Sequence, residues 1–351
     1  MTRLVAGVDV GGTKVAAIVV DDDGSVLGRG TRATHVDGGP APIAPVVGAV
    51  RDALAAASDG APLGADGAQP ELHLAAIGVG VPGRVDSDTG VVRLATNLGW
   101  QGMPLADLLT DEFGIPCRVE NDARIAAAGL LDSAAAGGAR NLAYVAVGTG
   151  IGAGIVLEGQ LHRGARGMAG EIGHVIVEAD GPPCSCGQHG CLEAVAAGPA
   201  VARRATEAIA DGAQTSLSAV PDLTAREVYD AARDGDAVAL GIVDEAGRVL
   251  ARAICGLVAT SDIERVLIGG GVAGAGQVFA GPLQAELDRL RAASGLIAEL
   301  LPADAVRLLP ADSNAVAWGG VAAARTALET GADRARPDIE VEEVVARATT
   351  S

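Results

Sequence analysis

The sequence predicts an α/β protein of two lobes that surround a cleft. Short apolar runs with the character of buried strands alternate with helical patterns along the chain. Three of these runs end in glycine-rich turns, near Gly11, Gly148 and Gly269. Because adjacent glycines let backbone amides approach a phosphate closely, we expect phosphate-facing turns in both halves of the chain. The 351 residues are enough for two domains of ordinary size.

The first half of the chain alternates strands with helices. Apolar runs bounded by Gly, Pro or Asp predict strands at residues 4–10, 15–20, 74–81 and 117–120. Helical patterns occur at residues 41–57, 105–113 and 123–131. The segment 21–24 predicts a hairpin turn, and the stretch 58–70, which is rich in Gly, Pro and Asp, predicts an exposed loop.

The second half becomes mainly helical after its first strand. That strand is expected at residues 141–147 and runs into a glycine-rich turn at 148–154. Thr224 and Glu227 have the spacing of a capping box at the start of a helix. The remaining elements are a long helix at 237–259, a strand at 265–268, a last strand at 306–309 and a last long helix at 313–330.

These elements predict how the lobes divide the chain. A small α/β lobe is expected from residues 1–120 plus about 313–330, and a large α/β lobe from residues 121–312. The charged residues 331–351 lack a clear apolar face and are expected to form a loose tail.

The charge of the chain argues against several classes of partner. With 44 acidic and 26 basic residues, the net charge is −18, and phosphate-rich nucleic acid or an anionic membrane needs clustered Lys and Arg instead. No signal peptide and no apolar stretch long enough to span a bilayer is expected. Five cysteines, three of them within eight residues, do not form the pattern of a secreted disulfide framework. We therefore expect a cytoplasmic protein that binds neither nucleic acid nor a membrane.

The cysteine cluster predicts a zinc site. His174, Cys184, Cys186 and Cys191 supply three thiolates and one imidazole, the ligand set of a structural tetrahedral zinc ion. The alternative is a buried trio of unpaired cysteines, which this spacing disfavours. With all four positions filled by protein, the ion has no open site for catalysis and is expected to hold a loop together.

Two glycine-rich turns predict phosphate binding. In the first, Gly11, Gly12 and Thr13 offer backbone and hydroxyl donors, Lys14 adds an ammonium group, and Asp9 could hold a magnesium-bound water. The alternative for this motif is a plain β-hairpin. The second turn, at residues 148–154, lacks the spacing of a Walker loop or a Rossmann fingerprint. Two such turns in opposite halves are compatible with a nucleotide held between lobes.

Carboxylates at strand and loop ends are candidates for the reaction itself. In the triplet Glu120-Asn121-Asp122, the Asp can accept a proton from a sugar hydroxyl and the Asn can contact adjacent hydroxyls. A helix N-cap is the simpler interpretation of the same triplet. Glu171 and Glu193 bracket the cysteine cluster and can accept hydrogen bonds from sugar hydroxyls, although exposed loop carboxylates remain an alternative.

Taken together, these motifs resemble the ROK family, which comprises repressors, open reading frames and sugar kinases. The resemblance covers roughly residues 4–328 and rests on Asp-Val-Gly-Gly-Thr-Lys, Glu-Asn-Asp, Gly-Thr-Gly-Ile-Gly-Ala-Gly and the His and Cys cluster. It implies an actin-like ATPase fold with two ribonuclease-H-like lobes and a homodimer or homotetramer. It also implies that ATP with Mg²⁺ donates a phosphoryl group to a hexose.

The resemblance also assigns roles to individual residues. Asp122 matches the base that deprotonates the sugar 6-hydroxyl, and His174 matches a residue that touches both sugar and zinc. The expected hexose contacts are Gly83, Asn97, Asn121, Asp122, Glu171, His174 and Glu193. The expected nucleotide and phosphate contacts are Asp9, Gly11, Gly12, Thr13, Lys14, Thr149, Gly150, Gly270 and Gly271.

Several activities compete within this resemblance. Phosphorylation of glucose at the 6-hydroxyl is the main expectation, and kinases of N-acetylmannosamine, N-acetylglucosamine or fructose are alternatives. The Cys-x-Cys-Gly cluster favours ATP over polyphosphate as the donor. A sugar-sensing repressor is disfavoured because the first phosphate motif begins at Asp9, which leaves no room for a preceding DNA-binding domain. A sugar-binding protein without catalysis would be expected to lose the base, and Asp122 is present.

Overall fold

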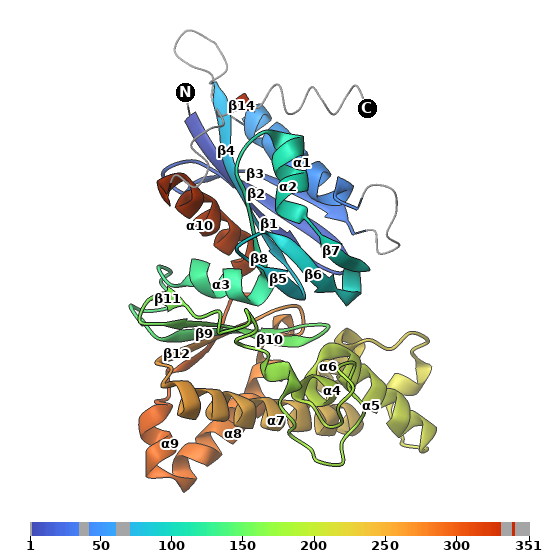
Figure 1. The fold of residues 1–351 in the computed structure, drawn as a ribbon. Helices are drawn as coiled ribbons and strands as arrows, with labels where there is room; N and C mark the ends of the chain where they lie inside the picture. Colours follow the sequence, from blue (N-terminus) through green and yellow to red (C-terminus); the bar gives the residue numbers. More distant parts are fainter. Residues whose placement is uncertain (1, 35–41, 61–70, 331–338, 341–351) are drawn as a thin grey trace. The chain divides into compact units, whose positions relative to one another are not determined.

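A computed structural model describes residues 2–34, 42–60, 71–330 and 339–340 of the chain. The chain forms two compact units (Figure 1). Unit 1 comprises Met1–Leu130, Arg163–Met168 and Asn314–Ser351, and unit 2 comprises Leu131–His162 and Ala169–Ser313. None of the helices in the described part of the chain has the length and apolar character needed to cross a membrane.

Unit 1 is built on a six-stranded mixed sheet. Its strands are β1 (Thr2–Val10), β2 (Lys14–Val20), β3 (Val26–Ala33), β4 (Leu72–Val81), β8 (Cys117–Asn121) and β14 (Ile339–Glu340). The order is β3-β2-β1-β4, with β8 and β14 both pairing along β4. Strands β1, β4 and β8 are parallel, and Asp9 is level with Gly80, which is level with Glu120. The carboxyl ends of these three strands therefore lie at one edge of the sheet.

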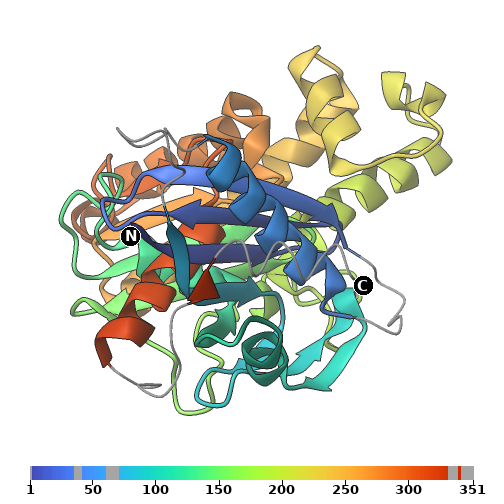
Figure 2. The ribbon, with the colours of Figure 1, turned by 90° about the horizontal axis from the view of Figure 1, so that it is seen from above.

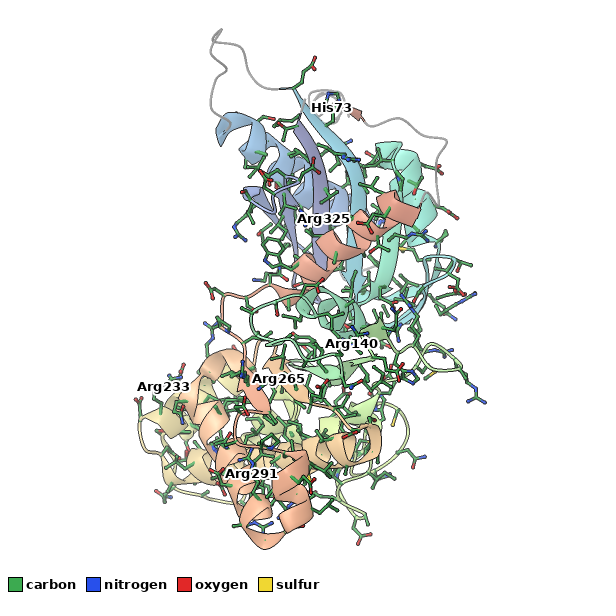
Figure 3. The ribbon with its side chains drawn as sticks, turned by 90° about the vertical axis from the view of Figure 1, so that its left-hand side faces the viewer. His73, Arg140, Arg233, Arg265, Arg291 and Arg325 are labelled. Carbon is green, nitrogen blue, oxygen red and sulfur yellow. The ribbon has the colours of Figure 1, made fainter. Side chains whose placement is uncertain are left out.

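Helices cover both faces of this sheet. They are α1 (Ala44–Gly60), α2 (Leu105–Phe113), α3 (Asp122–Leu130) and α10 (Ala315–Thr330). Alternate residues of β1 pack into different apolar clusters, one with α1 and α2 and the other with α10, and Figure 2 shows α1 lying along the sheet. A Cβ atom on Gly7 would lie 1.9 Å from the carbonyl oxygen of Ala317, so glycine permits the close approach of α10. Arg325 of α10 also donates to the carbonyl oxygen of Asp21 at 2.8 Å (Figure 3).

A small three-stranded sheet extends unit 1. It consists of β5 (Arg84–Asp86), β6 (Val91–Ala95) and β7 (Trp100–Met103), which form an antiparallel meander. Its strands follow β4 in the sequence. The small sheet therefore begins where the chain leaves the edge at which β1, β4 and β8 end.

Unit 2 repeats the strand order of unit 1. Its sheet runs β11 (Gln160–Leu161), β10 (Ile151–Leu157), β9 (Leu142–Val147), β12 (Arg265–Gly269) and β13 (Val306–Leu308). In each sheet the first three strands of the unit form an antiparallel meander, and the next two run parallel to the first strand. The helices are α4 (Leu192–Ala196), α5 (Gly198–Ala210), α6 (Ala225–Arg233), α7 (Ala237–Ser261), α8 (Gln277–Ala293) and α9 (Gly295–Leu300). The long helix α7 contributes many residues to the apolar core.

Several predicted elements are confirmed. Helix α2 has the predicted bounds, α7 ends two residues later than predicted, and the strands β1, β4, β8, β9 and β12 lie where apolar runs predicted them. The capping box at the start of α6 is formed by Thr224 and Glu227. The side chain of Thr224 accepts a hydrogen bond from the backbone of the first helical turn, and the side chain of Glu227 accepts one from the backbone N–H of Thr224. Local spacing was sufficient for these elements.

Other predictions were wrong at particular residues. The segment 148–154 is a turn only up to Gly150, because Ile151 begins β10, whose residues pair with β9. The strand at 306–308 is not the last, because β14 pairs with β4 further along the chain. Residues 58–60 belong to α1 rather than to a loop, whereas residues 41, 61–70 and most of the predicted tail lie outside the described residues. Helix α8 was missed because Pro282 lies inside it.

Candidate active site and metal centre

The turn between β1 and β2 lies at the carboxyl edge of the sheet of unit 1. The N–H of Gly11 donates to the carbonyl oxygen of Lys14 at 2.9 Å, and the hydroxyl of Thr34 donates to the carbonyl oxygen of Gly11 at 2.7 Å. Gly12, Thr13 and Lys14 are exposed. The structure thus presents a tied turn whose tip remains accessible, as binding of a phosphate requires.

Asp9 is the titratable group beneath this turn. Burial and the nearby charge of Asp122 raise the pKa of Asp9 to about 7, while Lys14 acts in the opposite direction. The electrostatic coupling places Asp9, Lys14 and Asp122 in one neighbourhood within unit 1. A carboxyl group with this pKa gains strongly from a bound cation, because the cation compensates the charge that burial disfavours.

Asp122 begins helix α3 and is oriented by its neighbour. The amide nitrogen of Asn121 donates to Asp122 Oδ1 at 2.9 Å and to the carbonyl oxygen of Gly83 at 3.1 Å. The amide oxygen of Asn121 accepts from the backbone N–H of Arg124 at 3.1 Å, and Asp122 Oδ1 accepts from the N–H of Ala123 at 2.8 Å. Asn121 is therefore an N-cap, and the same side chain also fixes the carboxylate of Asp122.

Two further predicted residues of unit 1 lie close to these groups. Gly83 has a φ of 92°, and a Cβ atom there would lie 2.3 Å from the carbonyl oxygen of Leu94. Asn97 is exposed on a short helical turn, and its Cβ lies 3.8 Å from the position that a Cβ on Gly12 would take. The structure thus brings Asn97 beside the first glycine turn and Gly83 beside Asn121.

The second glycine turn lies at the corresponding edge of the sheet of unit 2. The N–H of Gly148 donates to the carbonyl oxygen of Gly150 at 2.9 Å, and the N–H of Gly198 donates to the carbonyl oxygen of Gly148 at 2.9 Å. Gly270 follows the parallel strand β12 with a φ of 99° and would place a Cβ 2.5 Å from the carbonyl oxygen of Val147. The turn and the Gly270-Gly271 pair therefore lie side by side.

A cavity of about 890 Å³ opens beside this turn. Thr149 and Gly271, both predicted nucleotide contacts, line it together with the start of α6. Its polar side chains beyond the turn include Arg226, Asp230 and Arg233, and Arg233 is seen in Figure 3. These three residues and Tyr229 were not predicted from the sequence as site residues. The only feature that the sequence indicated in α6 was the capping box.

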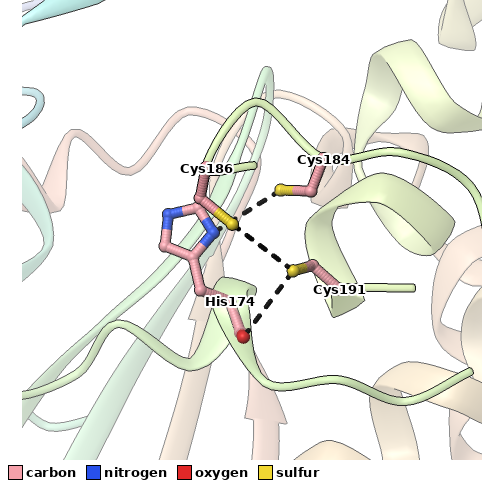
Figure 4. A group of neighbouring side chains, drawn as sticks. All are labelled: His174, Cys184, Cys186 and Cys191. Carbon is pink, nitrogen blue, oxygen red and sulfur yellow. Dashed lines mark hydrogen bonds between the residues drawn. The ribbon is translucent and has the colours of Figure 1, made fainter. Parts of the chain in front are cut away.

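His174 and three cysteines form the candidate metal centre (Figure 4). Their candidate ligand atoms all lie within 4.8 Å of one another. The Sγ atoms of Cys186 and Cys191 are 3.7 Å apart, and Cys184 Sγ is 3.7 Å from His174 Nδ1. Zinc–sulfur bonds of about 2.3 Å in a tetrahedron place sulfur atoms roughly 3.8 Å apart, so the four side chains fit a zinc ion.

The electrostatics of the cluster also favour a cation. Burial is the main cause that raises the pKa of Cys191 to about 12, and the hydrogen bonds with Cys186 and Cys184 and the repulsion by their thiolates add to it. A divalent cation removes that repulsion. The loop itself closes at Gly190, where φ is 69° and a Cβ would lie 1.5 Å from the carbonyl oxygen of Glu178.

Two carboxylates adjoin the metal centre and the second turn. Glu171 Oε2 lies 3.9 Å from His174 Nε2, the ring nitrogen that faces away from Cys184. Glu193 Oε2 accepts from the N–H of Ile151 at 3.0 Å, directly after Gly150. Glu193 is therefore attached to the second glycine turn, a contact that the sequence pattern did not indicate.

The predicted site residues are divided between the two units. Unit 1 contains Asp9, Gly11, Gly12, Thr13, Lys14, Gly83, Asn97, Asn121 and Asp122. Unit 2 contains Thr149, Gly150, Glu171, His174, Cys184, Cys186, Cys191, Glu193, Gly270 and Gly271. Within each unit the structure brings these residues to the ends of strands, to loops or to the first turns of helices.

Comparison with known proteins identifies the family. The sequence profile of the ROK family matches residues 5–304. The chain is a member of the ROK family. A glucokinase of Halalkalibacterium halodurans is 38% identical over 288 residues, covering 80% of this chain and 84% of the relative. A glucokinase of Thermotoga maritima is 36% identical over 285 residues, covering 79% and 85%.

A solved structure gives the same assignment for the fold. The ROK family glucokinase of Streptomyces griseus, in complex with glucose and AMPPNP, matches with a TM-score of 0.74 and 32% identity. The match covers 92% of this chain and 99% of that one. The predicted ROK membership and the α/β fold of the actin-like ATPase type are therefore confirmed.

Proposed function

We propose that this ROK protein is a hexose kinase that transfers the γ-phosphoryl group of ATP to the 6-hydroxyl of glucose. The observation that carries the proposal is the similarity to glucokinases over about four fifths of the chain. The family match over residues 5–304 includes the strand-end carboxylates and both glycine turns. The glucose and AMPPNP of the Streptomyces griseus complex support the same pair of substrates.

Asp122 is the proposed catalytic base. Its carboxylate accepts the proton of the sugar 6-hydroxyl as that oxygen attacks the γ-phosphorus. Asn121 holds the carboxylate through the 2.9 Å hydrogen bond and retains one amide-oxygen lone pair for a sugar hydroxyl. Asp9 and Lys14 are suited to the triphosphate and its Mg²⁺, since both adjoin the first turn and a cation would stabilise the charged form of Asp9.

The nucleotide is proposed to occupy the cavity of unit 2. Thr149 and Gly150 would hold phosphate oxygens through the second turn, and Gly270 and Gly271 would border the nucleoside. The cavity volume of about 890 Å³ is sufficient for a nucleotide.

The metal centre is proposed to hold the sugar-binding loop. Zinc bound through His174 Nδ1 leaves the proton on Nε2, which faces Glu171 and can donate to a sugar oxygen. Glu171 and Glu193 would accept hydrogen bonds from hydroxyl groups. A zinc ion held by these four side chains would fix the loop and would have no open position for a reactive water.

The two units correspond in this proposal to a small and a large lobe. Unit 1 contributes Asp122 and the first phosphate turn, and unit 2 contributes the nucleotide cavity and the metal centre. A homodimeric or homotetrameric assembly and a cytoplasmic location stay predictions.

An assay of hexose 6-phosphate formation tests the function, because this product forms whichever donor is used. Glucose, fructose, N-acetylmannosamine and N-acetylglucosamine are supplied in turn, with ATP or polyphosphate as the donor. We expect the highest kcat/KM with glucose and ATP. Turnover of an N-acetylated hexose above that of glucose would change the substrate assignment, and the absence of turnover with every hexose would contradict the kinase.

A further inference from the structure

The six residues Arg163–Met168 belong to unit 1, although the residues on both sides belong to unit 2. The segment leaves β11 and precedes the loop that carries Glu171 and His174. Gly167 near its end has a φ of 64°, a conformation that glycine adopts readily. Two of its residues contact the charged pair that flanks Asn121 and Asp122.

Glu120 is the centre of these contacts. Its side chain is buried, yet each of its oxygens accepts two hydrogen bonds. Oε1 accepts from the N–H of Asn121 and from Arg124 Nε, each at 2.8 Å. Oε2 accepts from the hydroxyl of Ser87 and from Arg163 Nε, each at 2.8 Å. Burial alone would raise the pKa of Glu120, but Arg124 and the hydrogen-bond donors lower it below its ordinary value.

Arg124 closes the network from the other side. Only 2% of its surface is exposed, and it heads the fully buried side chains ranked by volume in the described part of the chain. Besides Glu120, its guanidinium group donates to the carbonyl oxygen of Gly167 and, at 3.4 Å, to that of Val85. The 163–168 segment is therefore held at its start by Arg163 and near its end by Arg124.

Both members of the buried pair also contact Asn121. Glu120 accepts the backbone N–H of Asn121, and Arg124 offers the backbone N–H that the Asn121 side chain caps. Asn121 in turn donates to the carboxylate of Asp122. Since well-packed apolar residues often stabilise a protein as much as a buried ion pair does, stability alone is a weak reason for this pair.

We infer that Glu120, Arg124 and Arg163 are positioning residues for Asp122. The 163–168 segment contributes to this role, because it supplies Arg163 and the carbonyl oxygen that Arg124 binds. The inference rests on the proposed function, because it assigns the three side chains a role in the same reaction. They touch no reacting atom and act through Asn121.

Arg163 is the residue best suited to a test. Its side chain is 49% exposed, so Arg163→Gln removes one donor to Glu120 and leaves the buried pair with Arg124 in place. Arg163→Lys retains the charge, and Arg166→Gln is the matched control, because Arg166 is exposed in the same segment. All variants are assayed at a temperature well below their unfolding midpoints.

We expect Arg163→Gln to lower kcat by about 10- to 100-fold, the range that a displaced catalytic group produces, and to change KM for ATP by much less. Arg163→Lys should recover most of the lost kcat, and Arg166→Gln should behave as the wild type. An unchanged kcat in Arg163→Gln, or an equal loss in Arg166→Gln, would overturn the inference.

A double variant tests whether the effect passes through the base. In an Asp122→Asn background, Arg163→Gln should lower the residual turnover no further, because residues that act as a unit are not additive. A full further loss would mean that Arg163 acts elsewhere and would overturn the inference. The wild-type assay separates the two proposals: no hexose turnover there overturns the function and the inference together, whereas wild-type turnover with an unaffected Arg163→Gln overturns the inference alone.

Discussion

Units 1 and 2 share a strand order but carry different side chains at the corresponding edge of the sheet. Each has a glycine turn between its first two strands, at Gly11–Thr13 in unit 1 and at Gly148–Gly150 in unit 2. The first turn is flanked by the ionisable side chains of Asp9 and Lys14. The second turn has no charged residue of its own, and its nearest carboxylate, Glu193, is bonded to the backbone of Ile151.

This difference shows which part of the site the fold supplies and which part the side chains supply. The shared topology brings a turn rich in N–H groups to the carboxyl edge of each sheet. Unit 1 adds buried carboxylates near that edge, and unit 2 adds a cavity and a loop with a candidate metal site. We therefore assign proton transfer to unit 1 and the holding of substrates mainly to unit 2.

The largest expected effect is on the base of unit 1. Asp122→Asn should lower kcat by about 10²- to 10⁴-fold, the usual contribution of a general base, while the unfolding midpoint changes little. Steady-state assays with glucose and ATP measure the loss. Asp107→Asn is the matched control, because Asp107 lies exposed in the first turn of α2 as Asp122 lies in the first turn of α3. Near-normal turnover of Asp122→Asn would contradict the assignment of the catalytic base to Asp122 of unit 1.

The metal centre of unit 2 should show the next largest effect. Cys184→Ser is expected to lower the zinc content per chain and to raise the KM for glucose by about 10-fold or more, as when other metal-site residues are lost. Metal analysis and sugar titrations measure both quantities. Cys255→Ser, outside the cluster, is the control and should keep its zinc. An unchanged zinc stoichiometry in Cys184→Ser would contradict the ligand set.

Asp9 should make the cation-free protein less stable as the pH rises. Its pKa of about 7 in the folded protein lies above the ordinary value of 3.8. Folding is therefore more favourable when Asp9 is protonated than when it is charged. This contribution is complete below about pH 4 and is lost as the pH passes 7. Between pH 5 and pH 8 we expect the free energy of unfolding to fall by at least about 1.4 kcal/mol, the equivalent of one pKa unit.

Urea unfolding of wild type and Asp9→Asn at both pH values measures that contribution. The Asn variant lacks the titrating group, so its stability should vary less with pH than that of the wild type. Equal pH dependence in the two proteins would show that Asp9 does not titrate in this range. Mg²⁺ with ATP should reduce the difference, since the cation stabilises the charged carboxylate.

The smallest expected effect concerns the helix beside the cavity of unit 2. Thr224→Ala removes the capping box of α6 and should lower the free energy of unfolding by about 1 kcal/mol. Because Thr224 also lines the cavity, the KM for ATP should rise modestly while the KM for glucose stays unchanged. Thermal unfolding and ATP titrations measure these changes. A change in the KM for glucose alone would place the cavity outside the nucleotide site.

Local sequence patterns were sufficient to indicate the first glycine turn, the clustering of His174 with three cysteines and the carboxylates at the strand ends. The cysteines 184, 186 and 191 lie within eight residues, and the N-cap of α3 is adjacent to Asp122, so spacing alone indicated them. Contacts between distant residues were not predictable in this way. Arg163 meets Glu120 across 43 positions of the sequence, and the cavity draws on residues from Gly148 to Ala275.

Individual side chains explain the remaining errors. Gly152 and Gly154 suggested a turn, but they lie in β10, where pairing with β9 outweighs the weak strand preference of glycine. Strand β14 has two residues and pairs with β4 far earlier in the chain, so no local pattern marked it. Tertiary pairing decided both cases.

The kinetic comparison of Asp122→Asn with Cys184→Ser tests the division of roles most directly. Both are measured over a range of glucose concentrations at saturating ATP, after each variant has been shown to be folded. We predict that Asp122→Asn loses kcat with a small change in the KM for glucose, and that Cys184→Ser loses affinity for glucose with a much smaller change in kcat. A loss of kcat in Cys184→Ser as large as that in Asp122→Asn would contradict the assignment of proton transfer to unit 1 alone.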